Sequence, residues 1–367
     1  MISMAPRNAW YPLTWSRLVT RELACHRVLG NELVVYRAES GGAIALADVC
    51  PHRLAPLSKG KLRGDAVECG YHGMTFGADG RCIRIPGQKL IPANASVRSY
   101  PLHEKMGLVW IWPGNPELAD PSRIYDLPQY QRPGWHAAHG DALRIEANYL
   151  NLADNLCDPA HVSFVHLSTL GNSASEDVPV EHSFDNNDVL VWRWIKDAPP
   201  IPLFAKYGDF RGKVDRWHYY HYAAPCSAVI DFGSAEAHAI ADPGDRDQGL
   251  RIFACHFITP VDDHACIDHW LHVRNFALDS ADVDERLHAD FRIAFNEDKE
   301  ILERIEAVER AGPDVKRIRL AIDAAPQRMR RIVERMVAEE AGLSPAPVER
   351  ATTKEGDKGR PYEIDVA

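Results

Sequence analysis

The sequence predicts an α+β protein, in which a small all-β domain is followed by a larger domain that combines an antiparallel sheet with long C-terminal helices. Two observations predict this class. Short β-branched and aromatic runs separated by Gly, Pro and Asp fill the N-terminal part, and charged and apolar residues alternate at helical spacing near the C-terminus. A length of 367 residues fits two domains or one large one, and 46% hydrophobic residues can fill a sizeable core.

The first domain, residues 1–112, is expected to contain strands at 32–36, 43–49 and 108–112. Five prolines, at positions 113, 116, 121, 128 and 133, remove backbone donors, so residues 113–135 are expected to form a linker. The second domain, residues 136–343, should contain a helix near 152–166, strands at 189–195, 217–222, 228–232, 250–258 and 266–274, and helices at 281–312 and 314–342. Residues 344–367, rich in Pro, Lys, Glu and Gly, are expected to form a loose tail or surface arm.

Charge and hydropathy argue against several classes of partner. The 42 Lys and Arg against 52 Asp and Glu give 42 − 52 = −10 at neutral pH, with no basic stripe, which argues against binding to nucleic acid or to an anionic membrane surface. Apolar stretches such as 107–112 are far shorter than the roughly 20 residues of a membrane span. No secretory signal is visible and the 8 cysteines are sparse, so a cytoplasmic protein with mostly free thiols is expected.

Two Cys and His pairs suggest a first metal centre. Cys50 and His52 form one pair, and Cys69 and His72 form the other, each beside turn-forming Pro or Gly. Such a set can bind one zinc ion or a two-iron two-sulfur cluster with cysteines on one iron and histidines on the other. One ligand of each type per loop favours the cluster, a one-electron relay, over zinc or over four unrelated core residues. Cys82 is interpreted as a packing residue.

A second centre is suggested by Asp158, His161 and His166. Five residues of regular helix turn about 500°, which leaves the two imidazoles about 140° apart, so a shared ion requires an irregular helix. Asp158 has an alternative role as an N-cap with Pro159 in the first helical position, and the two roles are compatible. Two imidazoles with one carboxylate would bind ferrous iron and leave coordination sites open for O2.

Asp298 is the expected third ligand. With Phe291 at 0° on a helical wheel, Asp298 falls at about 340°, within the apolar stripe of the helix expected at 281–312. A buried carboxylate needs a cationic partner, either this metal or, alternatively, an arginine such as Arg292 or Arg304. Glu297 and Glu300, at about 240° and 180°, are expected to face solvent.

Taken together, these motifs resemble the oxygenase component of the Rieske non-haem iron oxygenases, and within it the vanillate and dicamba O-demethylase group. The resemblance covers nearly the whole chain and includes Arg-Asn-Ala-Trp-Tyr from residue 7, Cys-Pro-His-Arg, Tyr-His-Gly, Trp-Ile-Trp-Pro-Gly, Asp-Asn-Leu-x-Asp and Glu-Asp-Lys. It implies a Rieske β domain joined to a helix-grip catalytic domain. It also implies a [2Fe–2S] cluster and a mononuclear Fe(II), bound by Cys50, His52, Cys69 and His72, and by His161, His166 and Asp298, respectively.

The resemblance further implies a ring-shaped homotrimer, in which Asp158 hydrogen-bonds His161 and His72 of a neighbouring subunit. Asp154 and Asn155 would support the iron ligands from behind. Electrons would come from a ferredoxin or an NADH-dependent reductase, and O2 would hydroxylate or O-demethylate a small aromatic substrate. Ring hydroxylation or N-demethylation is the alternative reaction. Two more distant alternative functions are an electron carrier without oxygenase activity and a zinc-stabilised binding protein.

Asp231 and His256 lie on strands that line the substrate pocket in this group. An acid at 231 would disfavour an anionic substrate and favour a neutral phenol, amide or amine, unless Asp231 points away from the pocket. Aromatic side chains on the same strands are expected to be mostly core. Five further histidines without a partnered motif are not expected to touch metal: His218, His221, His264, His269 and His272.

Overall fold

The computed structural model describes residues 5–343. The tail expected at 344–367 lies outside the described residues. The N-terminal part contains ten short strands, at positions that include the three expected from sequence: β1 (Tyr11–Trp15), β2 (Ala24–Val28), β3 (Asn31–Arg37), β4 (Ala43–Ala47), β5 (Lys61–Arg63), β6 (Ala66–Glu68), β7 (Thr75–Phe76), β8 (Cys82–Arg84), β9 (Leu102–Lys105) and β10 (Leu108–Ile111). They form three antiparallel sheets, β1-β10-β9, β2-β3-β4 and β5-β6-β7-β8.

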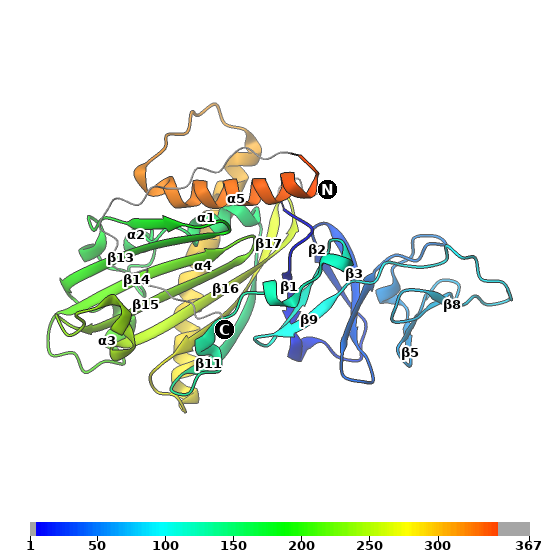
Figure 1. Ribbon diagram of the computed structural model, residues 1–367, viewed down its shortest axis with the longest axis horizontal. Coiled ribbons are helices and arrows are strands. Elements are labelled where there is room, and N and C mark those ends of the chain that lie inside the picture. Colours follow the sequence, from blue (N-terminus) through cyan, green and yellow to red (C-terminus); the bar gives the residue numbers. More distant parts are fainter. Residues whose placement is uncertain (1–4, 344–367) are drawn as a thin grey trace.

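The outer lobe of this β domain has its own small core. Figure 1 shows β5 and β8 at the end of the molecule farthest from the large sheet. Val34, Tyr36, Leu46 and Phe76 pack there with Cys82, which is 8% exposed. Cys82 is therefore a packing residue, as predicted.

The proline-rich segment is ordered as three single 3-10 turns, at Pro116–Leu118, Pro121–Arg123 and Pro128–Tyr130. Each turn has a proline at its start, where the missing N–H costs nothing. The side chains of Asn115 and Asp120 cap the first two turns by accepting from Glu117 N (3.1 Å) and Ser122 N (3.0 Å). The indole of Trp10 donates to the Asp120 carbonyl, which fastens the linker to the β domain.

The second part is built on one seven-stranded antiparallel sheet in the order β11-β17-β16-β15-β14-β13-β12. Its strands are β11 (His136–Ile145), β12 (Glu181–Phe184), β13 (Asp188–Ala198), β14 (Val214–Ala223), β15 (Ser227–Glu236), β16 (Leu250–Asp262) and β17 (Ala265–Arg274). The five strands expected from sequence are confirmed within longer ones, whereas β11 and β12 were not anticipated.

Five helices accompany the sheet: α1 (Tyr149–Asn155), α2 (Val162–Val165), α3 (Pro202–Ala205), α4 (Ala281–Ala311) and α5 (Ala324–Glu340). The single helix expected near 152–166 is in fact α1 and α2, separated by a break. Ser280 caps the start of α4, and Gly312 ends it with a left-handed φ of 62°. The expected start of the last helix at 314 is wrong, because Val315 and Ile318 are exposed and find no core that would hold a helix there.

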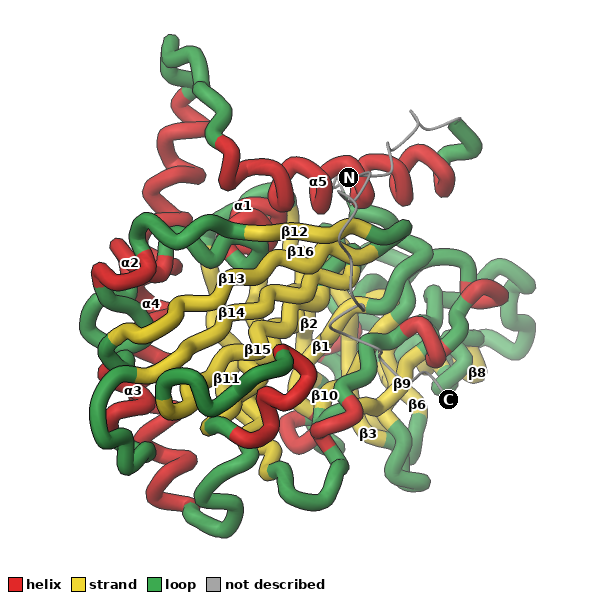
Figure 2. The backbone as a smooth tube through the Cα atoms, turned by 60° about the vertical axis from the view of Figure 1, so that its left-hand side comes forward, coloured by secondary structure: helices red, strands yellow, loops and turns green. Residues whose placement is uncertain are grey.

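The helix α4 lies across one face of the sheet (Figures 1 and 2). Its apolar stripe of Leu287, Phe291 and Phe295 packs against sheet residues that include Phe232 and Trp270. The sheet therefore grips α4, as the helix-grip prediction requires. The shorter α5 runs along the β12 and β13 side and buries Met329 and Ile332 in the main core.

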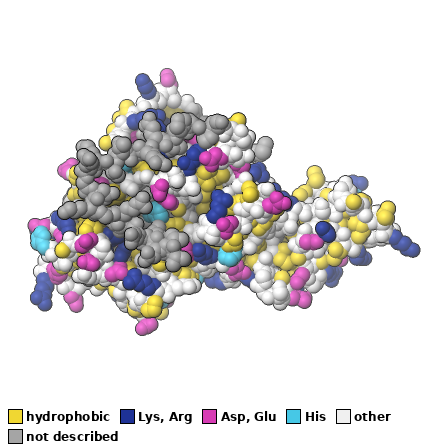
Figure 3. All heavy atoms as spheres, in the orientation of Figure 1, with side chains coloured by type: hydrophobic (Ala, Val, Ile, Leu, Met, Phe, Trp, Pro, Cys, Tyr) yellow, Lys and Arg dark blue, Asp and Glu magenta, His cyan; other side chains and the backbone are white. Residues whose placement is uncertain are grey.

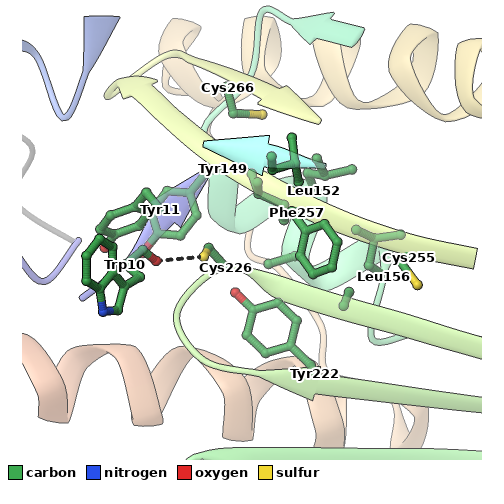
Figure 4. Packing of buried hydrophobic residues seen from close by; sticks show 14 of the residues in the cluster. Trp10, Tyr11, Tyr149, Leu152, Leu156, Tyr222, Cys226, Cys255, Phe257 and Cys266 are labelled. Carbon is green, nitrogen blue, oxygen red and sulfur yellow. Dashed lines mark hydrogen bonds between the residues drawn. The ribbon is translucent and has the colours of Figure 1, made fainter. Parts of the chain in front are cut away.

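That main core joins the N-terminal β domain to the large sheet. Figure 4 shows Trp10 and Tyr11 packed with Tyr149 of α1 and Phe257 of β16, and the Cys226 thiol donates to the Trp10 carbonyl at 3.3 Å. None of the eight cysteines forms a disulfide. No helix within residues 5–343 is long and apolar enough to cross a bilayer.

Candidate metal centres

The two Cys and His pairs lie on loops with the same backbone hydrogen-bond pattern. In the first loop, Cys50 N donates to Ala55 O (2.9 Å) and Cys50 O accepts from Leu54 N (2.9 Å). In the second, Cys69 N donates to Met74 O (2.7 Å) and Cys69 O accepts from Gly73 N (3.0 Å). The fifth residue of each loop is left-handed, with φ of 57° at Leu54 and 73° at Gly73. Each cysteine is thus fixed by its own closed turn.

The two cysteines and the two histidines of these loops lie in different environments. The Cys50 and Cys69 side chains are buried, whereas His52 and His72 are exposed and their ring centroids lie 4.6 Å apart. Burial, with a smaller contribution from Cys69, raises the pKa of the Cys50 thiol although backbone amides oppose the rise. Two adjacent thiols and two adjacent imidazoles are therefore presented as separate pairs.

This arrangement fits a cluster with two irons better than one zinc ion. Four zinc ligands would converge on one ion at about 2.0–2.3 Å each. Among residues 5–343, however, the only group of three or more donors within 4.8 Å of one another is His161, His166 and Asp298. A cysteine pair on one iron and a histidine pair on the other matches the donor set of a Rieske [2Fe–2S] cluster.

The second centre forms where α2 meets α4. His161 is the N-cap of α2 and His166 its C-cap, with φ −106° and ψ 39°, so the backbone leaves helical geometry at the second imidazole. The predicted irregularity between the two histidines is therefore present. Because α2 is a single turn flanked by loops, both rings can face α4.

The three donor groups converge closely. His166 Nε2 lies 3.2 Å from one oxygen of Asp298, and His161 Nε2 lies 3.6 Å from the other. Asn155 donates to Asp298 Oδ1 at 2.9 Å, so it supports the carboxylate as expected. Burial alone would raise the pKa of Asp298, but hydrogen bonding from His166 and the charge of His161 outweigh it and lower the pKa. Two imidazoles and a carboxylate are the donor set of non-haem Fe(II) oxygenases.

Each imidazole uses its other nitrogen to hold its orientation. His166 Nδ1 donates to Glu297 Oε2 at 2.8 Å, and His161 Nδ1 donates to the main-chain oxygen of Asp158 at 2.5 Å. Both Nε2 atoms are thereby directed toward Asp298. Burial lowers the pKa of His161, whereas the Asp298 and Glu297 carboxylates outweigh burial and raise the pKa of His166.

The prediction that Glu297 faces solvent is wrong. The wheel correctly placed it off the stripe that packs on the sheet, but α2 approaches α4 from that side and covers it. A carboxylate directly before the Asp298 ligand was the sequence signal that could have identified this partner.

Asp158 contacts His161 through its main-chain oxygen, which accepts the hydrogen bond from His161 Nδ1. Its carboxylate accepts from Ala160 N at 2.7 Å, which caps the turn that leads into α2, and burial raises its pKa. The alternative role of Asp158 as a helix N-cap with Pro159 in the first helical position is wrong, because the N-cap of α2 is His161 and the helix starts at Val162; Asp158 caps only the preceding turn.

Two expectations about charged neighbours are corrected. Asp154 does not support the iron ligands, because its carboxylate pairs with Arg330 of α5, with the closest contact at 2.6 Å. Successive helical residues point in different directions, so Asn155 faces Asp298 while Asp154 faces α5. The alternative salt bridge from Asp298 to Arg292 is also wrong, since Arg292 pairs with Asp141.

A cavity opens beside the three donors. Its walls come from α2, α4 and one face of the sheet: Asn155, Leu156, His161, Val162, His166, Leu170, His218, Tyr220, Ile230, Phe232, Ala254, His256, Phe291, Phe295 and Asp298. His256 donates from Nδ1 to Asp268 at 2.8 Å, which leaves its buried Nε2 without a partner among the described residues. Of the five histidines that sequence reasoning set aside, only His218 lines this cavity.

Asp231, in contrast, is not a pocket residue. Ile230 and Phe232 on either side of it line the cavity, so Asp231 points to the opposite face of β15. There it accepts hydrogen bonds from Arg246 (3.1 Å) and Arg251 (2.7 Å). The alternative that Asp231 points away from the pocket is therefore correct, and its carboxylate does not disfavour an anionic substrate.

Comparison with known proteins agrees with this geometry. Residues 9–101 match the Rieske [2Fe-2S] domain, and residues 145–339 match the vanillate O-demethylase oxygenase C-terminal domain. The chain is 34% identical to the toluene-4-sulfonate monooxygenase iron-sulfur subunit of Comamonas testosteroni, over 92% of this chain and 99% of that protein. It is 36% identical to the chloroacetanilide N-alkylformylase oxygenase component of Rhizorhabdus wittichii, over 82% and 86%.

A solved structure extends the likeness to the whole fold. Dicamba monooxygenase bound to 3,6-dichlorosalicylic acid superimposes with a TM-score of 0.84 at 30% identity, covering 91% of this chain and 98% of that one. The same enzyme has also been solved with non-haem iron. The chain therefore belongs to the vanillate O-demethylase oxygenase family of Rieske non-haem iron monooxygenases, which carry a [2Fe–2S] cluster and a mononuclear iron.

Proposed function

We propose that this protein is the terminal oxygenase of a multicomponent system that hydroxylates or O-demethylates a small aromatic substrate. The observation that carries the proposal is the convergence of His161, His166 and Asp298 at the wall of a mostly apolar cavity. O2 is the oxidant, and an NADH-linked reductase, directly or through a ferredoxin, supplies the electrons.

Each metal has an assigned set of ligands. Cys50, His52, Cys69 and His72 would hold the [2Fe–2S] cluster. His161, His166 and Asp298 would hold the iron. When bound, the iron supplies open coordination positions at which O2 is activated.

The cavity determines what is oxidised. Ile230, Phe232 and Phe295 exclude water and hold an aromatic ring beside the donors, while Nε2 of His256 offers a hydrogen bond to a polar substituent. For a methoxylated substrate, the balanced reaction consumes the ArOCH3 group, O2, two electrons and two protons, and yields ArOH, formaldehyde and water. The hydroxylated methyl carbon forms a hemiacetal, which breaks down to the phenol and formaldehyde.

A homotrimer would bring the two centres together. Within one chain, the cluster loops and α2 lie toward opposite ends of the molecule (Figure 1). Because the rate of electron tunnelling falls steeply with distance, the cluster of a neighbouring subunit is the better donor. Asp158, beside His161, would bridge to His72 of that neighbour and carry the electron.

The exposed apolar side chains support this assembly. Leu54 (74% exposed) and Tyr71 (60%) flank the cluster ligands, and Phe164 (64%) and Leu167 (56%) flank the iron ligands on α2. Figure 3 shows hydrophobic side chains on the surface of the lobe that contains β5 and β8. Two different apolar surfaces on one chain can pair head to tail, and a closed rotation makes a ring.

The chemistry of the cysteines and of the electron supply bears on the proposed cellular location. Eight cysteines without a disulfide, seven of them buried and two of those proposed as cluster ligands, suit a reducing compartment. An NADH-linked electron supply is also found there. These features support the proposal of a cytoplasmic location.

Oxygen uptake and formaldehyde release test the proposal. The purified protein would be supplied with a generic NADH-linked reductase and a panel of methoxylated, N-methylated and unsubstituted aromatics. Substrate-dependent uptake with formaldehyde from methoxylated compounds is expected, and it should vanish in Asp298→Ala while the cluster absorption persists. Reduction of the cluster without uptake for any compound would instead indicate an electron carrier.

A further inference from the structure

The helix α2 cannot hold its own position. It consists of one turn, Val162–Val165, and the two histidines that contact Asp298 lie at its two ends. A single helical turn is not stable by itself in water, because it fixes several dihedral angles for very few hydrogen bonds. The orientation of both imidazoles therefore depends on contacts from neighbouring elements. Asp298 and Glu297 of α4 supply one set of contacts, and a second set comes from β13.

Arg193 makes the contacts from β13. Its Nη2 donates to Pro159 O at 2.7 Å, and its Nη1 donates to Ser175 O at 2.8 Å. Pro159 comes shortly before His161 and Ser175 comes after His166, so one guanidinium binds the chain on both sides of α2. Because Arg193 is 1% exposed, water does not compete for these charge-assisted hydrogen bonds.

The chain that follows α2 passes this contact on to the helix. Ser175 Oγ lies 2.7 Å from Ser163 Oγ of α2, and both side chains are fully buried. Gly171, between them in sequence, lies so close to α2 that a Cβ atom there would be 2.1 Å from Val162 O. A displacement of Ser175 would therefore displace α2 as well, since close-packed groups cannot absorb it.

The charge of Arg193 is not neutralised by an ion pair. Within residues 5–343 its partners are the two main-chain oxygens, and no carboxylate forms a salt bridge with it. Burial lowers the pKa of the guanidinium, although Tyr220 and Asp158 oppose the fall. A buried cation without an ionic partner is costly, and a hydrophobic side chain of similar volume would fill the same space at less cost. The cost of burying Arg193 is therefore offset by what its two donors hold in place.

We propose that Arg193 is a positioning residue of the iron site, which orients His161 and Asp158 by fixing the main chain between them. The inference rests on the proposed function and adds a residue to it. Asp158 O accepts the hydrogen bond from His161 Nδ1. The next main-chain oxygen, that of Pro159, is the one that Arg193 holds. With this turn fixed, His161 Nε2 stays directed toward Asp298. The planar guanidinium suits the role, because an ammonium group is a point charge that cannot span two fixed acceptors with the same geometry.

Binding of Co(II) to the full-length protein tests the inference without requiring turnover. Co(II) accepts the same imidazole and carboxylate donors as Fe(II). The mononuclear site is emptied with a chelator while the cluster is kept in its oxidised, diamagnetic state, so the electron paramagnetic resonance spectrum reports the geometry of bound Co(II) alone. Arg193→Lys should weaken Co(II) binding about 10–100-fold, the range for outer partners of metal ligands, and should change this spectrum. The cluster absorption should not change.

Arg251→Lys is the matched control. Arg251 is also buried, and it donates two hydrogen bonds to Asp231, at 2.8 and 2.7 Å, on the opposite face of the sheet. This variant should lower the thermal stability as Arg193→Lys does, yet it should leave the affinity and the spectrum of Co(II) as in the wild type. Equal affinities and spectra in the two variants would reduce Arg193 to a packing role and overturn the proposal.

If Arg193→Lys does not fold, Ser163→Ala decides the question. This variant removes the contact between α2 and Ser175 Oγ and leaves Arg193 in place. Co(II) binding should weaken by a smaller factor than in Arg193→Lys, with a change in the spectrum. Unchanged affinity and spectrum would overturn the proposal.

Two further results separate this inference from the proposed function. Co(II) binding that depends on Arg193, with no oxygen uptake by the iron-loaded wild type for any substrate, would leave the positioning role standing and remove the oxygenase proposal. Oxygen uptake by the wild type, with Co(II) binding that does not depend on Arg193, would do the reverse.

Discussion

The two metal centres are built in opposite ways. The proposed cluster ligands lie on two short loops that each close by the same pair of main-chain hydrogen bonds, so the local backbone alone positions them. The proposed iron ligands lie at the two ends of α2 and on α4, and side-chain contacts position them, such as the one between His166 and Glu297, which are 131 residues apart in sequence. The first centre should therefore tolerate changes in domain packing, whereas the second should depend on how α2 lies against α4.

The strongest test of this contrast is to remove one ligand from each centre. Asp298→Ala leaves two imidazoles without an anionic ligand, so iron content and oxygen uptake should fall to background while the cluster absorption stays. Cys69→Ser should do the opposite and remove the cluster while retaining the iron. Metal analysis and absorption spectra measure both. Loss of both metals in either variant would show that the centres are not independent.

A smaller effect is expected at Glu297. Glu297→Gln weakens the hydrogen bond that orients His166, and outer partners of metal ligands typically contribute about 10–100-fold in affinity. Titration of the apoprotein with Fe(II) measures the change. Glu300→Gln, about one helical turn along α4 and exposed, is the matched control. Equal affinities in the two variants would mean that the His166 to Glu297 contact is incidental.

The pH dependence of iron binding also tests the role of Glu297 in holding His166. The pKa of His166 is raised above its ordinary value because the Asp298 and Glu297 carboxylates outweigh burial. In the apoprotein, protonated His166 contributes stability below about pH 6.5, and this is lost as pH rises through the raised pKa. Iron competes with that proton, so Fe(II) affinity should increase over the same interval. In Glu297→Gln the increase should move to lower pH; an unchanged profile would remove Glu297 as a cause.

The smallest effect is expected at the surface of the first loop. Leu54 holds a left-handed backbone that Asn also tolerates, so Leu54→Asn should leave the cluster spectrum unchanged. It removes an exposed apolar side chain from the proposed trimer interface, so dissociation of the proposed trimer should increase and turnover should fall by a few fold at low protein concentration. Leu118→Asn, at an exposed site in the linker, is the control. Sedimentation and oxygen uptake measure the two effects; identical behaviour would place Leu54 outside the interface.

Sequence reasoning succeeded where the pattern was local. The spacing of Cys50, His52, Cys69 and His72 reflects two tight turns, and Asp298 is conspicuous because a charge interrupts an apolar stripe. Glu297 was missed because a helical wheel treats only the sheet as a neighbour and cannot foresee that α2 covers another side. Asp231 was placed in the pocket because strand position alone does not indicate which face a residue takes.

The position of Asp298 on the same helix stripe as Phe291 and Phe295 has a practical consequence. Reactivity and one wall of the cavity depend on α4, while the opposite wall comes from β14, β15 and β16. Redesign for a new compound should therefore begin with the strands, where Ile230, Phe232 and Ala254 can be exchanged without displacing the oxidising centre.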